Sequence, residues 1–214
     1  MYNVSTNNVV LVLSPHTDDG ELSAGGTIAR LIENGADIHY IAFSSCEKSI
    51  PDGYACDVLI HECMNATRVL GIPEKNMHFL TYDVRDFPKF RQEILDDILL
   101  YKKDIYPDII FTPSSYDVHQ DHHVIYDESI RAFKKDATIF GMEHPWNNLG
   151  FKNDVNIILS EKNIATKISA LQKYTSQSGR TYFSEDYIRS LAKIHGLNVN
   201  SMYAEAFECI RIRV

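Results

Sequence analysis

Two separated stretches of the sequence gather side chains that bind metal ions or move protons. The first is SPHTDDGELSAGGT at residues 14–27, and the second is FTPSSYDVHQDHHVIYDES at residues 111–129. Imidazole nitrogen and carboxylate oxygen suit Zn²⁺, and a catalytic zinc usually takes three protein ligands and leaves a position for water. We therefore predict one hydrolytic metal site, with the candidate residues His16, Asp18, Asp19, His119, Asp121, His122 and His123.

The pattern of elements predicts how these stretches are held. Short apolar runs alternate with longer segments of helical period, which is typical of βαβ units. We expect strands at residues 9–14, 39–44, 77–80, 108–112 and 137–140, and helices at 21–33, 58–70, 90–101 and 122–133. After a loop at 144–151 we expect a strand at 155–159, a helix at 161–174 and a last strand at 203–214. The prediction is one α/β domain over residues 1–214, a Rossmann-like open, mostly parallel sheet with helices on both faces.

Both polar stretches begin where a predicted strand ends. In doubly wound sheets the first and fourth strands are often neighbours, and ligands bind outside the carboxyl ends of the strands where the strand order reverses. We therefore expect the two stretches to meet in space, although about a hundred residues separate them.

Two other interpretations of the first stretch stay open. Asp18 and Asp19 could cap the following helix, and the glycine pair at 25–26 could allow close packing. A cap does not require His16, however. A dinucleotide site needs the pattern G-x-G-x-x-G, which the stretch lacks, and its carboxylates would repel a pyrophosphate.

Composition narrows the class of protein. The 214 residues are 44% hydrophobic with a formal net charge of −8, which argues against binding a nucleic-acid backbone. The four cysteines form no C-x-x-C pattern and the N-terminus lacks a basic signal sequence, so we expect a cytoplasmic protein. No apolar run approaches the roughly 20 residues of a transmembrane helix. Composition leaves a homo-oligomer open.

The residues resemble a known family. PHTDDGELSAGGT resembles the PHPDD-x-E-x-G-x-GGT motif of the LmbE-like (PIG-L type) N-acetylglucosaminyl deacetylase superfamily, PSSYDVHQDHHV resembles its second motif, H-x-D-H, and the late YAEAF also fits. The resemblance implies the following roles: zinc ligands His16, Asp19 and His122, general base Asp18, His119 assisting the tetrahedral intermediate or leaving group, and Asp121 orienting a neighbouring histidine.

Some positions depart from the family motifs. Thr17 and Gln120 stand where proline is common, and Ser23 stands where glycine is frequent. None of them is a proposed ligand, so we expect metal binding to survive. Asp117 replaces a tyrosine that some members carry, so the resemblance assigns it no role. A His-Asp-His ligand set also suits Fe²⁺ or Co²⁺.

The predicted function is hydrolysis of the amide of an N-acetylated sugar, sugar nucleotide or glycoconjugate, with release of acetate. A protonated His119 would stabilise the oxyanion, and Asp121 or Asp117 would raise its pKa. The alternatives are a hydrolase of another small N-acyl amine and a catalytically silent metal- or carbohydrate-binding protein. Candidate substrate contacts are Asp83, Arg85, Trp146, Asn147 and Arg180, with Ser45, Glu47 and Asn148 as further candidates. Tyr174, Ser176 and Gln177 could form a loop over the site.

Overall fold

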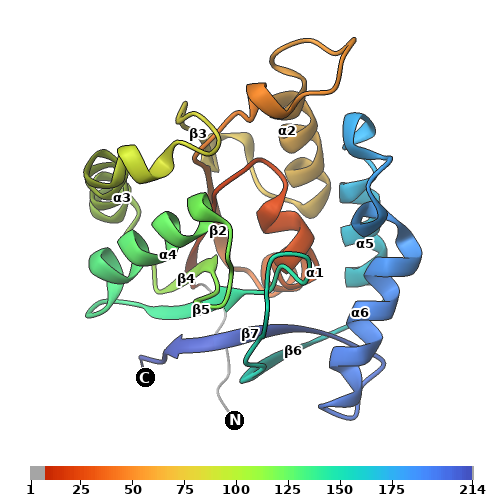
Figure 1. Ribbon diagram of the computed structural model, residues 1–214. Coiled ribbons are helices and arrows are strands. Elements are labelled where there is room, and N and C mark those ends of the chain that lie inside the picture. Colours follow the sequence, from red (N-terminus) through yellow and green to blue (C-terminus); the bar gives the residue numbers. More distant parts are fainter. Residues whose placement is uncertain (1–7, 214) are drawn as a thin grey trace.

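Seven strands form one sheet in the computed structural model, which describes residues 8–213 (Figure 1). The strands are β1 (Val9–Ser14), β2 (Asp37–Ala42), β3 (Met77–Phe79), β4 (Ile109–Pro113), β5 (Thr138–Met142), β6 (Val155–Leu159) and β7 (Tyr203–Arg211). The helices are α1 (Asp19–Glu33), α2 (Val58–Leu70), α3 (Arg91–Ile105), α4 (Gln120–Phe133), α5 (Glu161–Leu171) and α6 (Glu185–Leu197).

The order of the strands is β3-β2-β1-β4-β5-β7-β6. The first five strands in this order run parallel, whereas β7 is antiparallel to both β5 and β6. The chain moves outward from β1 to β3 and then returns to β4 on the other side of β1, so the strand order reverses between β1 and β4. The predicted Rossmann-like, mostly parallel sheet and the pairing of its first and fourth strands are confirmed.

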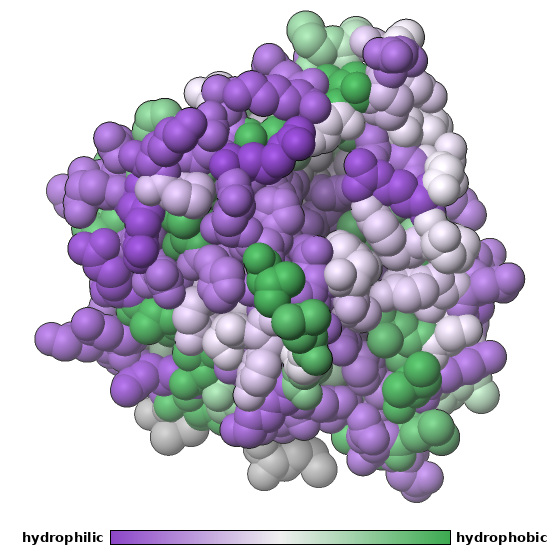
Figure 2. All heavy atoms as spheres, in the orientation of Figure 1, coloured by the Kyte–Doolittle hydropathy of each residue, from purple (hydrophilic) through white to green (hydrophobic). Residues whose placement is uncertain are grey.

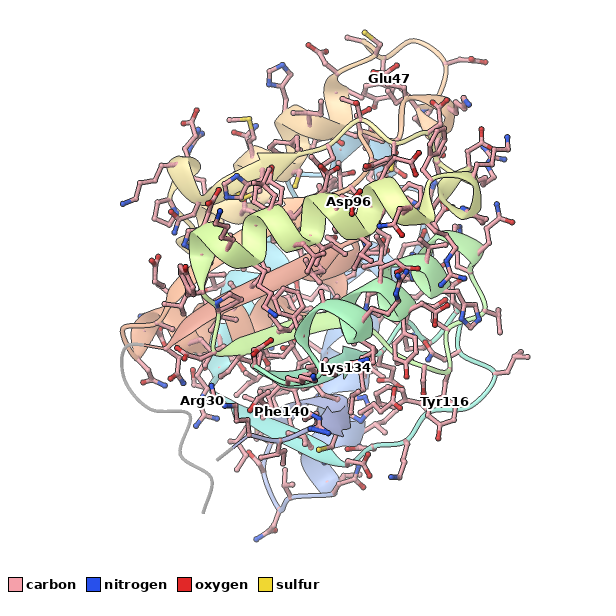
Figure 3. All side chains as sticks on the ribbon, turned by 90° about the vertical axis from the view of Figure 1, so that its left-hand side faces the viewer. Arg30, Glu47, Asp96, Tyr116, Lys134 and Phe140 are labelled. Atoms are coloured by element: carbon pink, nitrogen blue, oxygen red, sulfur yellow. The ribbon has the colours of Figure 1, made fainter. Side chains whose placement is uncertain are left out.

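Two helical layers enclose the sheet. Helices α3 and α4 lie side by side across one face, and α1, α2, α5 and α6 cover the other (Figures 1 and 3). The apolar run of β1 explains why both faces are covered: Val10 and Val12 enter one core and Leu11 and Leu13 enter the other. A strand buried on both faces is apolar at every position rather than at alternate ones.

Several predicted boundaries differ from the structure. Helix α1 begins at Asp19 instead of residue 21, β2 begins two residues earlier than expected, and α3 extends to Ile105, where Tyr106 adopts a left-handed conformation before Pro107. Helix α5 ends at Leu171, before the predicted end at residue 174. The sequence prediction missed α6 altogether.

Some sequence expectations fall outside the described residues. Residues 1–7, part of the N-terminal stretch that suggested the cellular compartment, and Val214, the end of the predicted last strand, are among them. Within residues 8–213, no helix is long and apolar enough to cross a membrane.

Candidate active site

The turn from β1 to α1 carries the first group of polar side chains. Ser14 Oγ accepts the N–H of Gly20 at 3.0 Å and donates to the carbonyl oxygen of His16 at 2.6 Å, which folds the chain sharply after the strand. A Cβ atom on Gly20 would lie 2.6 Å from the ring of Tyr40, so the turn requires glycine there. Asp19 Oδ2 accepts the backbone N–H of His16 at 2.9 Å, which fixes the carboxylate beside that histidine.

The turn from β4 to α4 carries the second group. Asp117 Oδ1 accepts the N–H of His119 at 2.9 Å, and His119 Nδ1 accepts the N–H of Asp121 at 3.2 Å as the N-cap of α4. This cap starts α4 with His122 in its first turn, facing β1. Because β1 and β4 are paired, the two turns meet at the same edge of the sheet, as predicted.

Three atoms from these turns form a compact triangle. Asp19 Oδ2 lies 3.1 Å from both His16 Nδ1 and His122 Nε2, and these two nitrogen atoms lie 3.3 Å apart. A tetrahedral zinc with bonds of roughly 2.0–2.1 Å holds its ligand atoms about 3.3 Å apart. The predicted ligand set His16, Asp19 and His122 therefore has the donor types and the spacing that fit one divalent ion.

Each histidine of the triangle is held from behind by a carboxylate. His16 donates from Nε2 to Asp121 Oδ2 at 3.1 Å, and His122 donates from Nδ1 to Asp117 Oδ2 at 2.6 Å. These contacts leave His16 Nδ1 and His122 Nε2 as lone-pair donors, which is the usual arrangement of metal-binding histidines. Asp117, without a role from the sequence, thus orients His122.

The charges at the triangle favour a cation. Burial by itself lowers the pKa of His16, but Asp19 and Asp121 outweigh burial and raise that pKa to about 10. Burial also lowers the pKa of His122, but Asp19 and Asp117 outweigh burial and raise that pKa to about 9. Burial opposes ionisation of Asp19, yet His122 and His16 hold its pKa well below the usual value. The carboxylates draw positive charge to this point, which is what a divalent ion supplies.

Asp18 and His119 line the cavity beside the triangle, but neither contributes one of its three atoms. Burial, and then the charge of Asp19, raise the pKa of Asp18 to about 6. Burial and the neighbouring His122 and His16 lower the pKa of His119 to about 4. The expected protonated His119 is not supported, because burial together with His122 and His16 outweighs the nearby charges of Asp121 and Asp19. With Nδ1 accepting, neutral His119 offers its Nε2–H as a donor.

The cavity at this edge of the sheet has a volume of about 390 Å³. Figure 2 shows the hollow in the face that carries it. Four of the predicted substrate contacts line it: Arg85, Trp146, Asn147 and Arg180. Asp83 does not line it and instead pairs with Lys48 at 3.0 Å. His123, among the first candidates, is exposed on α4 and points away.

Of the further candidates for substrate contact, some line the cavity and others do not. Ser45, Glu47 and Asn148 do not line the cavity, and Figure 3 shows Glu47 projecting from the outer loop after β2. Gln177 lines it, but Tyr174 and Ser176 do not. Sequence reasoning missed lining residues without obvious chemistry, including Cys46, Ser49, Leu59, Val84 and Tyr182.

Sequence reasoning also missed His144, a histidine that contacts Asp19 and Asp117. It is fully buried after β5, with Nε2 3.6 Å from Asp19 Oδ1 and Nδ1 3.2 Å from Asp117 Oδ2. Its ring meets that of His122 edge-on at 4.8 Å. The described residues contain two further groups that could bind a metal ion. One consists of Asp19, His122 and His144, and the other of His16, His119 and His122. The lone histidine of EHPW carried no spacing signal that could have revealed this.

The glycine pair and the late YAEAF stretch belong to one contact. Glu205 accepts the N–H groups of Gly26 and Thr27 at 3.0 and 2.7 Å and pairs with Lys167 at 2.6 Å. A Cβ atom on Gly26 would lie 2.5 Å from Leu159 Cδ1 and 3.1 Å from Glu205 Oε1. The pair therefore allows α1 to dock on β6 and β7, which holds the first polar turn in place.

Comparison with known proteins identifies the family. The PIG-L family, described as GlcNAc-PI de-N-acetylase, matches residues 11–133. The chain is 30% identical to the uncharacterized deacetylase YaiS of Escherichia coli K12 over 174 residues, covering 78% of this chain and 90% of YaiS. It is 25% identical to diacetylchitobiose deacetylase of Thermococcus kodakarensis over 227 residues, covering 94% of this chain and 82% of that enzyme.

A structural relative shows that the fold carries more than one chemistry. The 4-carboxy-2-hydroxymuconate hydratase GalB of Pseudomonas putida superposes with a TM-score of 0.76 at 20% identity, covering 97% of this chain and 98% of that one. Fold alone thus does not decide the reaction, which has to be argued from the site. The two polar turns both lie within the matched residues, and the chain belongs to the PIG-L (LmbE-like) deacetylase family.

Proposed function

We propose that this protein is a zinc-dependent hydrolase that removes the acetyl group from an N-acetylated sugar or sugar conjugate. The observation that carries the proposal is the triangle of His16, Asp19 and His122 donor atoms with Asp18 beside it in one open cavity. A site that only binds a metal has no need of a second carboxylate in the cavity next to the ligands.

The amide bond determines what each residue has to do. When bound, zinc would polarise the acetyl carbonyl and lower the pKa of a water toward about 7. Asp18 takes a proton from the attacking water, and the same carboxyl group then donates it to the leaving amine. His119 donates its Nε2–H to the oxygen on which negative charge develops. Asp121 and Asp117 keep His16 and His122 oriented.

The sugar specificity is supported by the lining of the cavity and by the relatives. Trp146 and Tyr182 stack with ring centroids 4.1 Å apart, and such aromatic surfaces suit a sugar ring. Diacetylchitobiose deacetylase, by its name, acts on an N-acetylated sugar. We place the enzyme in the cytoplasm, where its cysteines, all free in the structure, stay reduced.

The test measures acetate and bound metal together. Purified protein is loaded with zinc, and acetate and free amine are measured with N-acetylglucosamine, N,N′-diacetylchitobiose and a panel of N-acetylated amino acids. We expect one zinc per chain and acetate from sugars, and Asp18→Asn should keep zinc while losing acetate release. Release from amino acids alone would make the protein a hydrolase of another N-acyl amine. Bound zinc without release from any substrate would overturn the proposal in favour of a binding protein.

A further inference from the structure

One wall of the cavity is built from the segment between α5 and α6 and is firmly anchored. Glu62 on α2 accepts from Thr175 Oγ1 and from the N–H of Ser176, both at 2.8 Å, and from Ser176 Oγ at 2.6 Å. The N–H of Arg180 donates to the carbonyl oxygen of Gln177 at 3.0 Å. The backbone of this wall is therefore tied to α2 at Thr175 and Ser176.

Three side chains that line the cavity, Trp146, Tyr182 and Arg180, lie against one another. Trp146, from the loop after β5, stacks on Tyr182 with an angle of 14° between the rings. The guanidinium of Arg180 lies 5.9 Å from the centre of the Tyr182 ring and donates to its hydroxyl. The contact with the ring and the hydrogen bond to the hydroxyl position the guanidinium and leave its other N–H groups available.

Arg180 differs from several arginines of the outer surface that are paired with carboxylates. Arg68, Arg91 and Arg189 each contact at least one carboxylate within the ion-pair distance. Among the described residues, Arg180 has no such partner, and its one side-chain hydrogen bond goes to Tyr182. A guanidinium has five N–H donors in a fork that matches a carboxylate or a phosphate. Its unused donors therefore have the geometry of an anion-binding group.

The charge of the cavity agrees with this assignment. The lining includes two carboxylates, Asp18 and Asp19, and two guanidinium groups, Arg85 and Arg180. A divalent ion on the ligand triangle would add two positive charges to this lining. In a chain with a formal net charge of −8, the guanidinium groups of Arg85 and Arg180 give their part of the cavity a positive charge that would favour an anionic substituent.

We propose that Arg180 recognises an anionic substituent, a carboxylate or a phosphate group, on the N-acetylated sugar. This assignment rests on the proposed function and narrows its substrate class. It also separates this chain from a relative named for a neutral disaccharide. The volume of about 390 Å³ leaves room for a substituted sugar beside the metal ligands.

The kinetic test compares charged and neutral sugars. Acetate release from N-acetylglucosamine, its 1-phosphate, its 6-phosphate, UDP-N-acetylglucosamine and N-acetylglucosaminuronic acid is measured for zinc-loaded wild type, Arg180→Gln and Arg180→Lys. We expect at least one anionic substrate to exceed N-acetylglucosamine in kcat/KM by about 10- to 100-fold, the range of a charge-assisted hydrogen bond. Arg180→Gln should remove this advantage mainly through KM, and Arg180→Lys should keep part of it. Comparing the phosphorylated sugars with N-acetylglucosaminuronic acid shows whether Arg180 prefers a phosphate or a carboxylate.

The matched control is Lys173→Gln, which removes a positive charge from the same segment at an exposed position outside the cavity. This variant should keep the preference for the anionic substrate. Equal turnover of neutral and anionic sugars by wild type would overturn the assignment. So would an equal loss on every substrate in Arg180→Gln, because that result would mean that Arg180 acts through the fold or through the charge of Asp18, and not on an anionic substituent.

Binding separates this proposal from the proposed function. Titration calorimetry with the same sugars on zinc-loaded protein reports the dissociation constant without turnover. Tighter binding of a charged sugar that disappears in Arg180→Gln would support the anion site even if no acetate were released. Binding that Arg180→Gln leaves unchanged would overturn it, whatever the activity.

Discussion

Two buried carboxylates in the first turn of α1 behave in opposite ways. Asp19 lies against His16 and His122, which hold its pKa well below the usual value despite burial. Glu21, two residues later, is hydrogen-bonded to the hydroxyls of Tyr40 and Tyr174. Burial raises the pKa of Glu21 to about 8, and these neutral hydroxyls offset burial only in part.

The difference shows how surroundings give two acids different duties. A carboxylate is kept ionised in the interior only where positive partners compensate its charge, whereas one among neutral hydroxyls is kept protonated. Asp19 therefore faces the cavity as a charged ligand. Glu21 ties α1 to β2 and to Tyr174. The Tyr174 hydroxyl donates its one proton to the carbonyl oxygen of Thr17 in the polar turn, so protonated Glu21 is the donor to Tyr174. One acid serves the chemistry and the other supports the turn.

The same chemical change at the two positions should give the largest contrast. Asp19→Asn replaces a charged ligand by a neutral amide, so zinc affinity should fall by more than about 100-fold. Losing a residue that only hydrogen-bonds to a ligand typically costs about 10- to 100-fold. Acetate release should disappear with the metal. Glu21→Gln, the matched control, should bind zinc like wild type. Chelator competition measures both, and equal zinc loss in the two variants would contradict the division of roles.

Asp18 tests whether the neighbouring carboxylate acts on protons rather than on the metal. Asp18→Asn should bind one zinc per chain but lower kcat by about 100- to 10,000-fold, the usual contribution of a general base. The measurements are acetate release and metal content of the same preparation. Metal loss in this variant would mean that Asp18 and Asp19 have exchanged roles.

Asp117 tests the support behind the ligands. It accepts from His122 Nδ1 at 2.6 Å, so Asp117→Asn should weaken zinc binding by about 10- to 100-fold by freeing the imidazole. Saturating zinc should restore much of the activity. If added zinc had no effect and the purified variant already carried a full complement of the metal, the contact would be structural only.

Substitutions of Glu21 should have the smallest effect on activity but a measurable effect on the free energy of unfolding. Glu21→Gln keeps a neutral group of the same shape, so the free energy of unfolding should change by less than about 1 kcal/mol. Glu21→Ala leaves the hydroxyls of Tyr40 and Tyr174 without this hydrogen-bond partner and opens a cavity, which should cost about 2–4 kcal/mol. Urea unfolding measures both, and a larger loss in Gln than in Ala would contradict a neutral Glu21.

Much of this arrangement could be predicted because the signals were local. The apolar run of β1 and the helical periods around it predicted a sheet in which β1 and β4 pair, and the two motifs then had to meet. Helix α6 was missed although Ser184 accepts the N–H of Tyr187 as its N-cap and the buried Ile188, Ala192 and His195 repeat at helical spacing. That signal was present and overlooked.

Other features depend on tertiary contacts that no local pattern carries. The role of Asp117 follows from its distance to His122, and the burial of His144 follows from where the loop after β5 passes. The protonated His119 expected from the sequence is not supported, because burial together with His122 and His16 lowers its pKa. Which acid faces which imidazole is decided by packing across the sheet edge.

The most direct test of the ligand assignment is the position of the metal. Crystals of zinc-loaded protein measured at the zinc absorption edge should show one anomalous peak, about 2.0–2.2 Å from His16 Nδ1, Asp19 Oδ2 and His122 Nε2. A peak bound by His119 or His144 in place of Asp19 or His16 would contradict the account, because Asp19 would then no longer be the charged ligand that distinguishes it from Glu21.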